Sequence, residues 1–589
     1  MSTFVRRKPV VRVGKRYVYL QLVRNERRNG RHVQRVLMSL GREDELDRAE
    51  IDRTVAALAS HTKEAIVLKS PEEIDLHSAV PFGDGFLIEQ LWRELHLDRV
   101  IKTAPQDRRL ALDIELLSRC MVVNRLIWPA SKLATTRWLG RDIEIPGLSE
   151  GLDVQNLYRA MDHLLPLKER IEAHLFNRLT TLFNLDVSLV FYDTTLAHFE
   201  GEGMEELVRF SRKNKRLEKK EILICVVMSR DGFPIFHEVL PGNNNDVSTV
   251  AAIVRKLKER FQIKECVFVG DGGMHSDDNI RVIEQELKYK TIVGVPLRAR
   301  AVVRDEILRR AGRYHTIKNN LRVKEVDVDG QRYVLGFNPE EARREKSRRI
   351  HLLQSLQKKI DALPRAKDPI KARAKILADT QRARYLWRPK KTTKKGASTV
   401  PKTSTDLKSA EPRLYPLRID QSRVRRAARY DGKHVIQTSA ALDRDEVARI
   451  YRDLQRLEYC FKHLKSAAIW VRPAYHWRDR RIRAHVLLCV IALVIERMIQ
   501  RRLDGAGLNV EAPRALEELA RICAAVETLH DKTYRVRCEP TAEAAAILAA
   551  CGVHLPPRVT QLTDPADLPA RRGVVPTKKA RSAPRAETN

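Results

Sequence analysis

Short runs of β-branched and aromatic residues dominate the middle of the chain and predict strands. The first run starts at Val187 and ends on an acid, Asp193. An Asp-Gly pair at 231–232 separates the next two runs and predicts a hairpin. In chain order the predicted elements are strand 187–193, strand 221–229, strand 233–240, helix 247–261, strand 265–271, a helix from about Ser276, and strand 291–297. Together they predict an α/β domain with a mixed sheet.

Asp193 and Asp271 each stand at the carboxyl end of a predicted strand. A carboxylate in that position costs free energy unless a cation or a metal ion neutralises it. Open α/β sheets place their functional sites at this edge of the sheet. We therefore expect the two carboxylates to belong to one site.

A strongly helical segment, 445–467, offers a third acid. Its apolar residues, among them Leu454, fall on one stripe when successive residues are turned by about 100°. Tyr451, Glu458 and Lys465 follow each other at intervals of seven and form a row along the edge of that stripe. This row places Glu458 where it can approach the two aspartates. The alternative is a glutamate at a boundary position that pairs with a neighbouring lysine.

The remaining patterns divide the chain into six segments. Residues 16–40 alternate apolar and polar positions around Arg-Asn-Gly, which predicts a basic hairpin that either lies on nucleic acid or forms a small solvated domain. Residues 84–185 have helical periodicity, typical either of a helix-turn-helix DNA reader or of a helical bundle. The six expected segments are a basic N-terminal β-hairpin region (1–75), a helical, DNA-binding domain (76–185), the first part of a core domain (186–300), a helix-rich basic insertion (301–430), the second part of the core domain (431–505), and a C-terminal helical segment with a disordered basic tail (506–589).

The charge of the chain points to a polyanionic partner. Among 589 residues, 110 lysines and arginines outnumber 76 aspartates and glutamates, which gives a formal net charge of +34 at pH 7. Nucleic acid is the main expectation, and an anionic membrane surface is the alternative. The most apolar run, 484–499, is too short and too closely flanked by arginines to span a bilayer, so it predicts a buried helix. The eight cysteines form no Cys-x-x-Cys pair, which favours reduced thiols in a cytoplasmic protein and indicates no zinc site.

These motifs together resemble the bacterial insertion-sequence transposases of the DDE type, in the group with a Tyr/Arg/Glu/Lys signature around the third acid. The matching pieces are YDTT at 192–195, PGNNND at 241–246, VGDGGM at 269–274, the row of Tyr451, Glu458 and Lys465, and the segment 471–493. The resemblance covers about 185–500. At one position the chain departs from the signature, because the family's arginine, three residues after the tyrosine, is Leu454 here.

The resemblance implies a ribonuclease-H-like core, a mixed five-stranded sheet flanked by helices and split by a large insertion. It also implies that Asp193, Asp271 and Glu458 are the catalytic acids and hold two Mg²⁺ ions, for which Mn²⁺ would substitute. The residues expected to contact DNA are Tyr451 and Lys465, at phosphates near the cut, Arg452 and Arg456, as substitutes for the missing arginine, and Arg472 and His476, which otherwise cap the following helix.

The implied activity is that of a transposase that binds the ends of its own insertion sequence, cleaves them with divalent metal and joins the 3′-hydroxyls to target DNA. Its expected partner is double-stranded DNA, at the element ends and at the target, and coordinated cutting of two ends implies a homodimer on DNA. We expect a cytoplasmic, nucleoid-associated protein without a membrane partner. Two other classes remain open: a non-enzymatic, domesticated DNA-binding protein, and a metal-dependent DNA nuclease without strand transfer.

Overall fold

The computed structural model describes residues 3–563 apart from a set of internal segments. The segments outside the description are 29–30, 60–74, 104–111, 140, 144, 146–147, 149–151, 200–205, 211–219, 245, 299, 301, 319, 388–415, 466–475, 477 and 530–531. The side chains of 455–465 also lie outside it. The chain forms two compact units, of which one comprises Met1–Leu87, Thr136–Leu152 and Arg514–Asn589, and the other Ile88–Thr135 and Asp153–Pro513.

The first unit contains two antiparallel sheets. One consists of β1 (Thr3–Arg12), β2 (Lys15–Arg28) and β3 (Arg31–Arg42), so the predicted hairpin is present as its second and third strands. The other has the order β17-β16-β15-β4, with the bounds Val559–Leu562, Lys532–Arg537, Cys523–Leu529 and Asp75–Pro81. The same unit also contains three helices, α1 (Arg48–Ala59), α16 (Ala512–Leu519) and α17 (Ala542–Ala550).

The C-terminal region differs from the helical segment that the sequence analysis expected, because three of its elements are strands. β15 pairs antiparallel with β4, and Ala524 faces Val80 across that ladder. The partner of β15 lies hundreds of residues earlier in the chain, so the sequence around β15 indicates a strand only by its own few residues. The helices α16 and α17 dominate the hydrophobic pattern on either side of it. The expected disordered tail at 564–589 lies outside the described residues.

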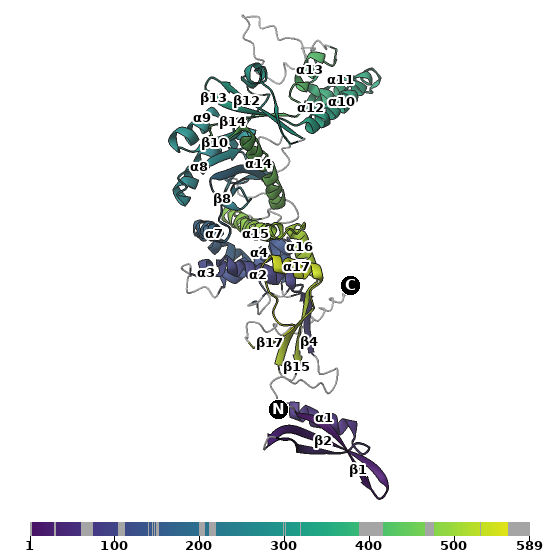
Figure 1. Cartoon of the computed structure of the whole chain (residues 1–589). Helices are drawn as coiled ribbons and strands as arrows, with labels where there is room; N and C mark the ends of the chain where they lie inside the picture. The colour runs from purple at the N-terminus through teal and green to yellow at the C-terminus, as the bar shows by residue number, and fades with distance from the viewer. Residues whose placement is uncertain are drawn as a thin grey trace, which may run out of the picture. The chain divides into compact units, whose positions relative to one another are not determined.

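The second unit is built around one ten-stranded mixed sheet. Its order is β11-β12-β13-β14-β10-β9-β5-β7-β6, and β8 pairs with β7 beside that path. Figure 1 labels β12, β13, β14, β10 and β8 of this sheet. The bounds in chain order are β5 Leu189–His198, β6 Arg209–Phe210, β7 Lys220–Ser229, β8 Pro234–Pro241, β9 Val267–Gly270, β10 Lys290–Val295, β11 His315–Lys318, β12 Leu321–Val328, β13 Gln331–Phe337 and β14 Lys433–Thr438. β5, β9 and β10 run parallel to one another, and the other pairs are antiparallel.

The sheet therefore has more strands than the five that were expected. All five predicted strands are present as β5, β7, β8, β9 and β10, but β14 pairs with both β10 and β13 and so extends the sheet to β11. Residues 301–430, expected to be a helix-rich insertion, contribute β11–β13 between a short π-helix (Val303–Ile307) and their longer helices. In β12 buried and exposed residues largely alternate, as in a strand with one solvated face. The long charged helix that follows, α10 (Pro339–Asp361), dominates the composition of the segment and hides this signal.

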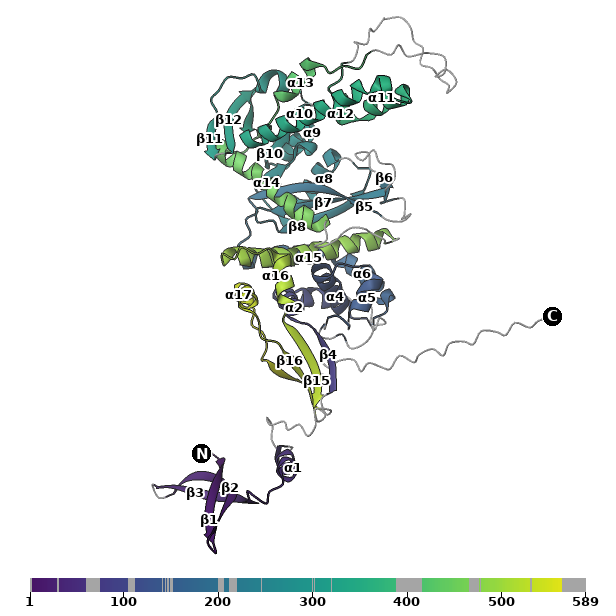
Figure 2. The same cartoon turned by 90° about the vertical axis from the view of Figure 1, so that its right-hand side faces the viewer.

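Helices cover both faces of this sheet. α14 (Arg444–Lys465) packs against β5, β9, β10, β12, β13 and β14, and Figure 2 shows it lying across the strands. α8 (Asp246–Phe261) and α9 (Asp277–Arg281) lie on the opposite face, as the side-chain directions described below indicate. The remaining helices of residues 339–428 are α11 (Pro369–Ala378), α12 (Thr380–Ala383) and α13 (Gln421–Ala428).

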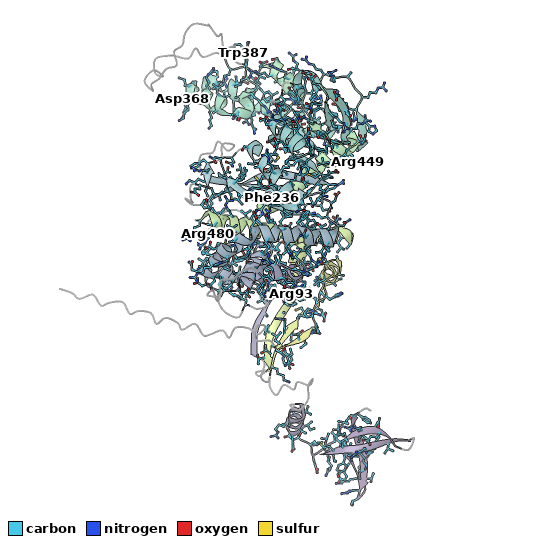
Figure 3. The ribbon with its side chains drawn as sticks, turned by 90° about the vertical axis from the view of Figure 1, so that its left-hand side faces the viewer. Arg93, Phe236, Asp368, Trp387, Arg449 and Arg480 are labelled. Carbon is cyan, nitrogen blue, oxygen red and sulfur yellow. The ribbon has the colours of Figure 1, made fainter. Side chains whose placement is uncertain are left out.

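The helical part of the second unit packs against the hairpin strand β8. It contains α2 (Gly83–Glu94), α3 (Leu97–Lys102), α4 (Ile114–Ile127), α5 (Lys132–Trp138), α6 (Val154–Leu164), α7 (Lys168–Phe183) and α15 (Asp479–Gly505). α15 is the predicted buried helix, and it is apolar all round because α4 and α6 pack on it together with β8. Phe236 of β8, labelled in Figure 3, is buried, and the charged groups of Lys168 and Arg260 lie 4.8 and 5.3 Å from its ring centre. No helix within the described ranges is long and apolar enough to cross a membrane.

Candidate active site

Asp193 and Asp271 follow residues that are paired with each other on adjacent strands. β5 and β9 run parallel, and Tyr192 lies opposite Gly270 in their register. Each acid is the next residue along its strand, so the two backbones carry Asp193 and Asp271 side by side. The register of β5 and β9 therefore agrees with the expectation that the two acids lie close together.

Asp193 differs in one respect from the expectation that its strand ends there. β5 continues to His198, because β7 pairs with it along this stretch and places Val226 opposite Asp193. On the other side β9 ends at Gly270, so the ladder with β9 ends at Tyr192, one residue before Asp193. The half-buried Asp193 carboxylate accepts a hydrogen bond from the Thr194 amide at 2.7 Å.

The direction of the Asp193 side chain follows from its neighbour. The hydroxyl of Tyr192 is hydrogen-bonded to Thr249 of α8 at 2.7 Å, so Tyr192 points to the α8 face of the sheet. Successive side chains of a strand point to opposite faces. Asp193 therefore points to the face on which α14 packs against β5 and β9.

Tyr451 of α14 reaches the second acid from that face. Its hydroxyl donates a hydrogen bond of 3.5 Å to Oδ1 of Asp271, which is exposed at the start of a 3₁₀ turn. The same hydroxyl lies over Gly294 of β10, where an added Cβ would overlap it. His434 of β14 stacks on the Tyr451 ring, with 5.9 Å between ring centres and 16° between planes. Sequence reasoning identified Tyr451 and missed Gly294 and His434, because neither follows a motif.

α14 also carries the two other members of the predicted row. The helix runs without interruption through Glu458 and Lys465, seven and fourteen residues after Tyr451. Seven residues are about two turns, or about 10 Å along the axis, so all three positions lie on one side of the helix. The side chains of Glu458 and Lys465 lie outside the described residues, and their roles stay predictions.

The signature position on α14 is buried. Leu454 has 7% of its surface exposed, which confirms its predicted place in the apolar stripe. Arg452, half-buried beside it, donates a hydrogen bond from Nη1 to Asn320 Oδ1 at 3.3 Å. The side chain of Arg456 lies outside the described residues. Arg452 is thus oriented by the turn before β12, and its predicted DNA contact stays a prediction.

His476 lies among helices. Its ring is 5.9 Å from that of Tyr158 in α6 and 5.1 Å from that of His485 in α15. Burial, together with the nearby cations Lys132, Arg125 and Arg481, lowers the pKa of His476 to about 3. His476 therefore packs in the helical part of the second unit, and the described residues show no contact between His476 and Asp271. Arg472 lies outside the described residues.

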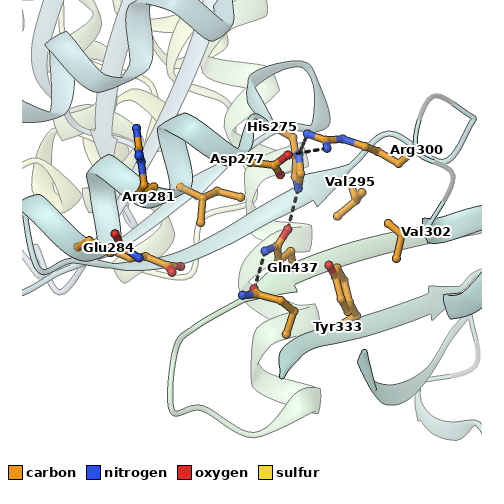
Figure 4. Close-up of a pocket in the computed structure, with 12 residues that line it drawn as sticks. His275, Asp277, Arg281, Glu284, Val295, Arg300, Val302, Tyr333 and Gln437 are labelled. Carbon is orange, nitrogen blue, oxygen red and sulfur yellow. Dashed lines mark hydrogen bonds and ion pairs between the residues drawn. The ribbon is translucent and has the colours of Figure 1, made fainter. Parts of the chain in front are cut away.

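A polar cavity of about 320 Å³ lies on the other face of the sheet, where α9 packs (Figure 4). His275, four residues after Asp271, is a buried residue of its lining and shares a 2.8 Å hydrogen bond with Gln437 of β14. Arg300 donates to Nδ1 of His275 at 3.1 Å and to Asp277 at 2.9 Å. Burial lowers the pKa of His275, so its ring is neutral at neutral pH. These contacts attach the turn that follows Asp271 to the sheet.

The two aspartates have the donor atoms that a hard divalent cation prefers. Mg²⁺ is bound through carboxylate oxygens and keeps several waters, and both carboxylates are at least partly accessible. Among the side chains that the structure describes, no group of three or more His, Cys, Asp or Glu residues forms a complete metal site. The described residues therefore fit part of a magnesium site.

Two family models match the chain. Residues 188–495 match the model described as "Transposase DDE domain", and residues 5–72 match "IS1634 family transposase, N-terminal domain". The first match spans about half of the chain and contains Asp193, Asp271 and Glu458. No curated protein matches the chain in sequence.

Several solved structures show a distant likeness. The chain is 9% identical to the piggyBac transposase in a synaptic complex with hairpin DNA, over 74% of this chain and 80% of that one, with a TM-score of 0.37. It is 14% identical to the Mos1 transposase in a paired-end complex with the left transposon end, over 42% and 68%, with a TM-score of 0.14.

Proposed function

Because the chain belongs to the family of DDE transposases, we propose that it binds the ends of its own insertion sequence, cleaves them with divalent metal and joins the 3′-hydroxyls to target DNA. The observation that supports this most directly is the register of β5 and β9, which brings Asp193 and Asp271 side by side. α14 packs against both strands and carries Glu458 on the same side as Tyr451, which is bonded to Asp271.

The proposal includes a ribonuclease-H-like core within the larger sheet. Its five strands would be β8, β7, β5, β9 and β10, in that spatial order, with the first three antiparallel and the last two parallel to β5. α8 and α14 would be the helices on its two faces. The strands β11–β14 would then extend this core from the β10 edge.

In this site Asp193, Asp271 and Glu458 would hold two Mg²⁺ ions, and Mn²⁺ would substitute for them. When bound, a pair of such ions stabilises both the attacking and the leaving oxygen of an in-line phosphoryl displacement. Asp193 would hold them from the central strand of the proposed core. Glu458 would complete the site from α14.

Side chains of α14 would hold the DNA strand near the scissile phosphate. The Tyr451 hydroxyl can donate to a phosphate oxygen, and Lys465 would add a positive charge two turns beyond Glu458. Leu454 cannot donate, so Arg452 and Arg456 would supply the guanidinium contact that the signature places at 454. The net charge of +34 provides the long-range attraction to double-stranded DNA. Cutting at two ends would require a homodimer on DNA.

The test compares the wild-type protein with Asp193→Ala and with Asp278→Ala, a matched control whose carboxylate is 90% exposed. Each is incubated with Mg²⁺ and a plasmid that carries the gene with its native flanks, and strand breaks and joined ends are mapped at nucleotide resolution. We expect breaks at the element boundaries with the wild type and the control, and none with Asp193→Ala, while all three bind the end DNA equally in a gel-shift assay.

Other outcomes would replace the proposal. Scattered breaks that ignore the boundaries, also lost in Asp193→Ala, would indicate a nuclease without strand transfer. Binding of end DNA without any cutting by the wild type would indicate a non-enzymatic DNA-binding protein. Normal cutting by Asp193→Ala would remove Asp193 from the site.

A further inference from the structure

Two glycines make room for an aromatic pair next to Asp271. Gly336 of β13 lies opposite His434 of β14 in the ladder, and a Cβ added to Gly336 would overlap the His434 ring. The Cε1–Nε2 edge of the ring therefore occupies the space that a side chain at Gly336 would fill. Gly294 of β10 makes the same kind of space for the Tyr451 hydroxyl.

The His434 ring in turn contacts the ring of Tyr451. The planes are inclined by 16° and the centres are 5.9 Å apart, which is an offset stack rather than a chance edge contact. The Tyr451 ring thus packs on His434, and its hydroxyl lies against Gly294. The same hydroxyl is directed to Asp271, at 3.5 Å.

A cavity of about 200 Å³ adjoins this pair and explains why such support matters. Both rings line it, together with Asn320, Lys433 and Arg452. A tyrosine that borders an open space can turn into it when nothing holds its ring. Burial lowers the pKa of His434 to about 4, so it offers a neutral, flat surface at neutral pH.

We propose that His434 is a positioning residue: seated on Gly336, its ring holds Tyr451 so that the phenol hydroxyl stays between Gly294 and Asp271. The inference rests on the proposed function, because it concerns the geometry of the same site. His434 itself touches neither of the two aspartates in this arrangement, and its effect on cleavage passes through Tyr451.

The test measures end cleavage by His434→Ala, His434→Phe, Tyr451→Phe and the double variant His434→Ala/Tyr451→Phe. His434→Ala should lower the maximal cleavage rate roughly three- to tenfold, the factor an aromatic pair of this kind is worth, with little change in the DNA concentration at half-maximal rate. His434→Phe keeps the flat ring and should restore the rate. In the Tyr451→Phe background His434→Ala should cause no further loss, because the hydroxyl that it positions is already absent.

Three results would overturn the inference: equal loss in His434→Phe and His434→Ala, losses that multiply in the double variant, or a wild-type rate in His434→Ala. Thermal unfolding shows whether His434→Ala folds. If His434→Ala does not fold, it is replaced by His434→Leu, whose side chain fills a similar volume without a flat face. Cleavage by His434→Leu at the rate of His434→Phe would contradict the inference. Asp193→Ala in the same assay separates the two claims. If it cuts normally, Asp193 is not part of the site and the proposed active site fails. If it is inactive, the His434 series tests the inference by itself.

Discussion

Gly294 lies directly against the hydroxyl of Tyr451, which is the atom that bonds to Asp271. A glycine on β10 is thus what allows a helix side chain to reach an acid on β9. In Gly294→Ala the added methyl group would displace the hydroxyl, and misplacing a group in a reacting site by about 1 Å can cost on the order of 100-fold in rate. We expect a loss of cleavage of that order, measured on end DNA, with unchanged DNA binding.

The control for this variant is Gly505→Ala at the end of α15, where nothing lies within 4 Å of an added Cβ. It should cleave at the wild-type rate. Wild-type cleavage by Gly294→Ala would mean that the Tyr451 hydroxyl has no part in the reaction.

Glu458 is predicted to be the third acid of the site. Glu458→Ala should abolish cleavage and leave DNA binding intact, since one ligand of the metal pair would be missing. Glu446→Ala removes an exposed glutamate from the first turn of the same helix and should retain activity. Binding of Mn²⁺ followed by paramagnetic resonance should weaken only in the Glu458 variant. Equal activity of the two variants would contradict the assignment.

Replacing Leu454 by the arginine of the signature should destabilise the protein. Leu454 is buried in the stripe that α14 turns to the sheet, so Leu454→Arg would bury an unpaired charge and lose apolar contacts. We expect the free energy of unfolding to fall by about 3 kcal/mol or more, measured by denaturant titration. Glu446→Arg, at an exposed position of α14, should change it by less than about 0.5 kcal/mol. A stable Leu454→Arg variant with faster cleavage would show that α14 can turn this position toward DNA.

Glu172 is a buried carboxylate that joins α7 to β8 and α8. It accepts hydrogen bonds from Lys168 at 3.1 Å and Arg260 at 2.8 Å, and lies 2.8 Å from Nδ1 of His237. Burial by itself raises its pKa, but His237, Lys168 and Arg260 outweigh burial and lower the pKa to about 2. Glu172→Gln leaves the Lys168 and Arg260 cations without a counter-charge and should lower the free energy of unfolding by about 3 kcal/mol.

The sign of the pH effect follows from that lowered pKa. The stabilisation from Glu172 is complete above the unfolded-state pKa of about 4.3 and is lost as pH falls toward about 2. The difference between wild type and Glu172→Gln should therefore shrink in acid. Glu169→Gln, an exposed glutamate on the same helix, should match the wild type at every pH.

His476 should make the protein sensitive to mild acid. Its pKa is lowered to about 3 in the fold by burial and by Lys132, Arg125 and Arg481, against about 6.5 in the unfolded chain. Its contribution to stability is complete above about pH 6.5 and falls by at most roughly 1.4 kcal/mol per pH unit below it, because the unfolded chain takes up the proton first. His476→Gln should reduce this slope in unfolding measured between about pH 7.5 and about pH 5.5. An unchanged slope would mean that His476 titrates normally in the fold.

The sequence by itself determined the local elements and the chemistry that they carry. A run of β-branched residues ending near Asp193, a second ending near Asp271 and a heptad-spaced row on one helix each depend on a few neighbouring residues. Hydrophobic periodicity therefore predicted the five central strands, the buried helix at 484–499 and the buried position of Leu454. The pairing of acids at one sheet edge followed from a general rule about open α/β sheets.

Only the tertiary structure decided how far the sheet extends and what surrounds the site. β14 joins β10 to β13, and β15 joins β4, through hydrogen bonds between residues far apart in the chain, which no local pattern encodes. The same reason applies to Tyr451: helical phase placed it at the edge of a stripe, but Gly294 and His434 become its neighbours only when β10 and β14 pair. His476 contacts Tyr158 and His485 because packing between helices α6 and α15 determines its surroundings, and its predicted DNA contact stays a prediction.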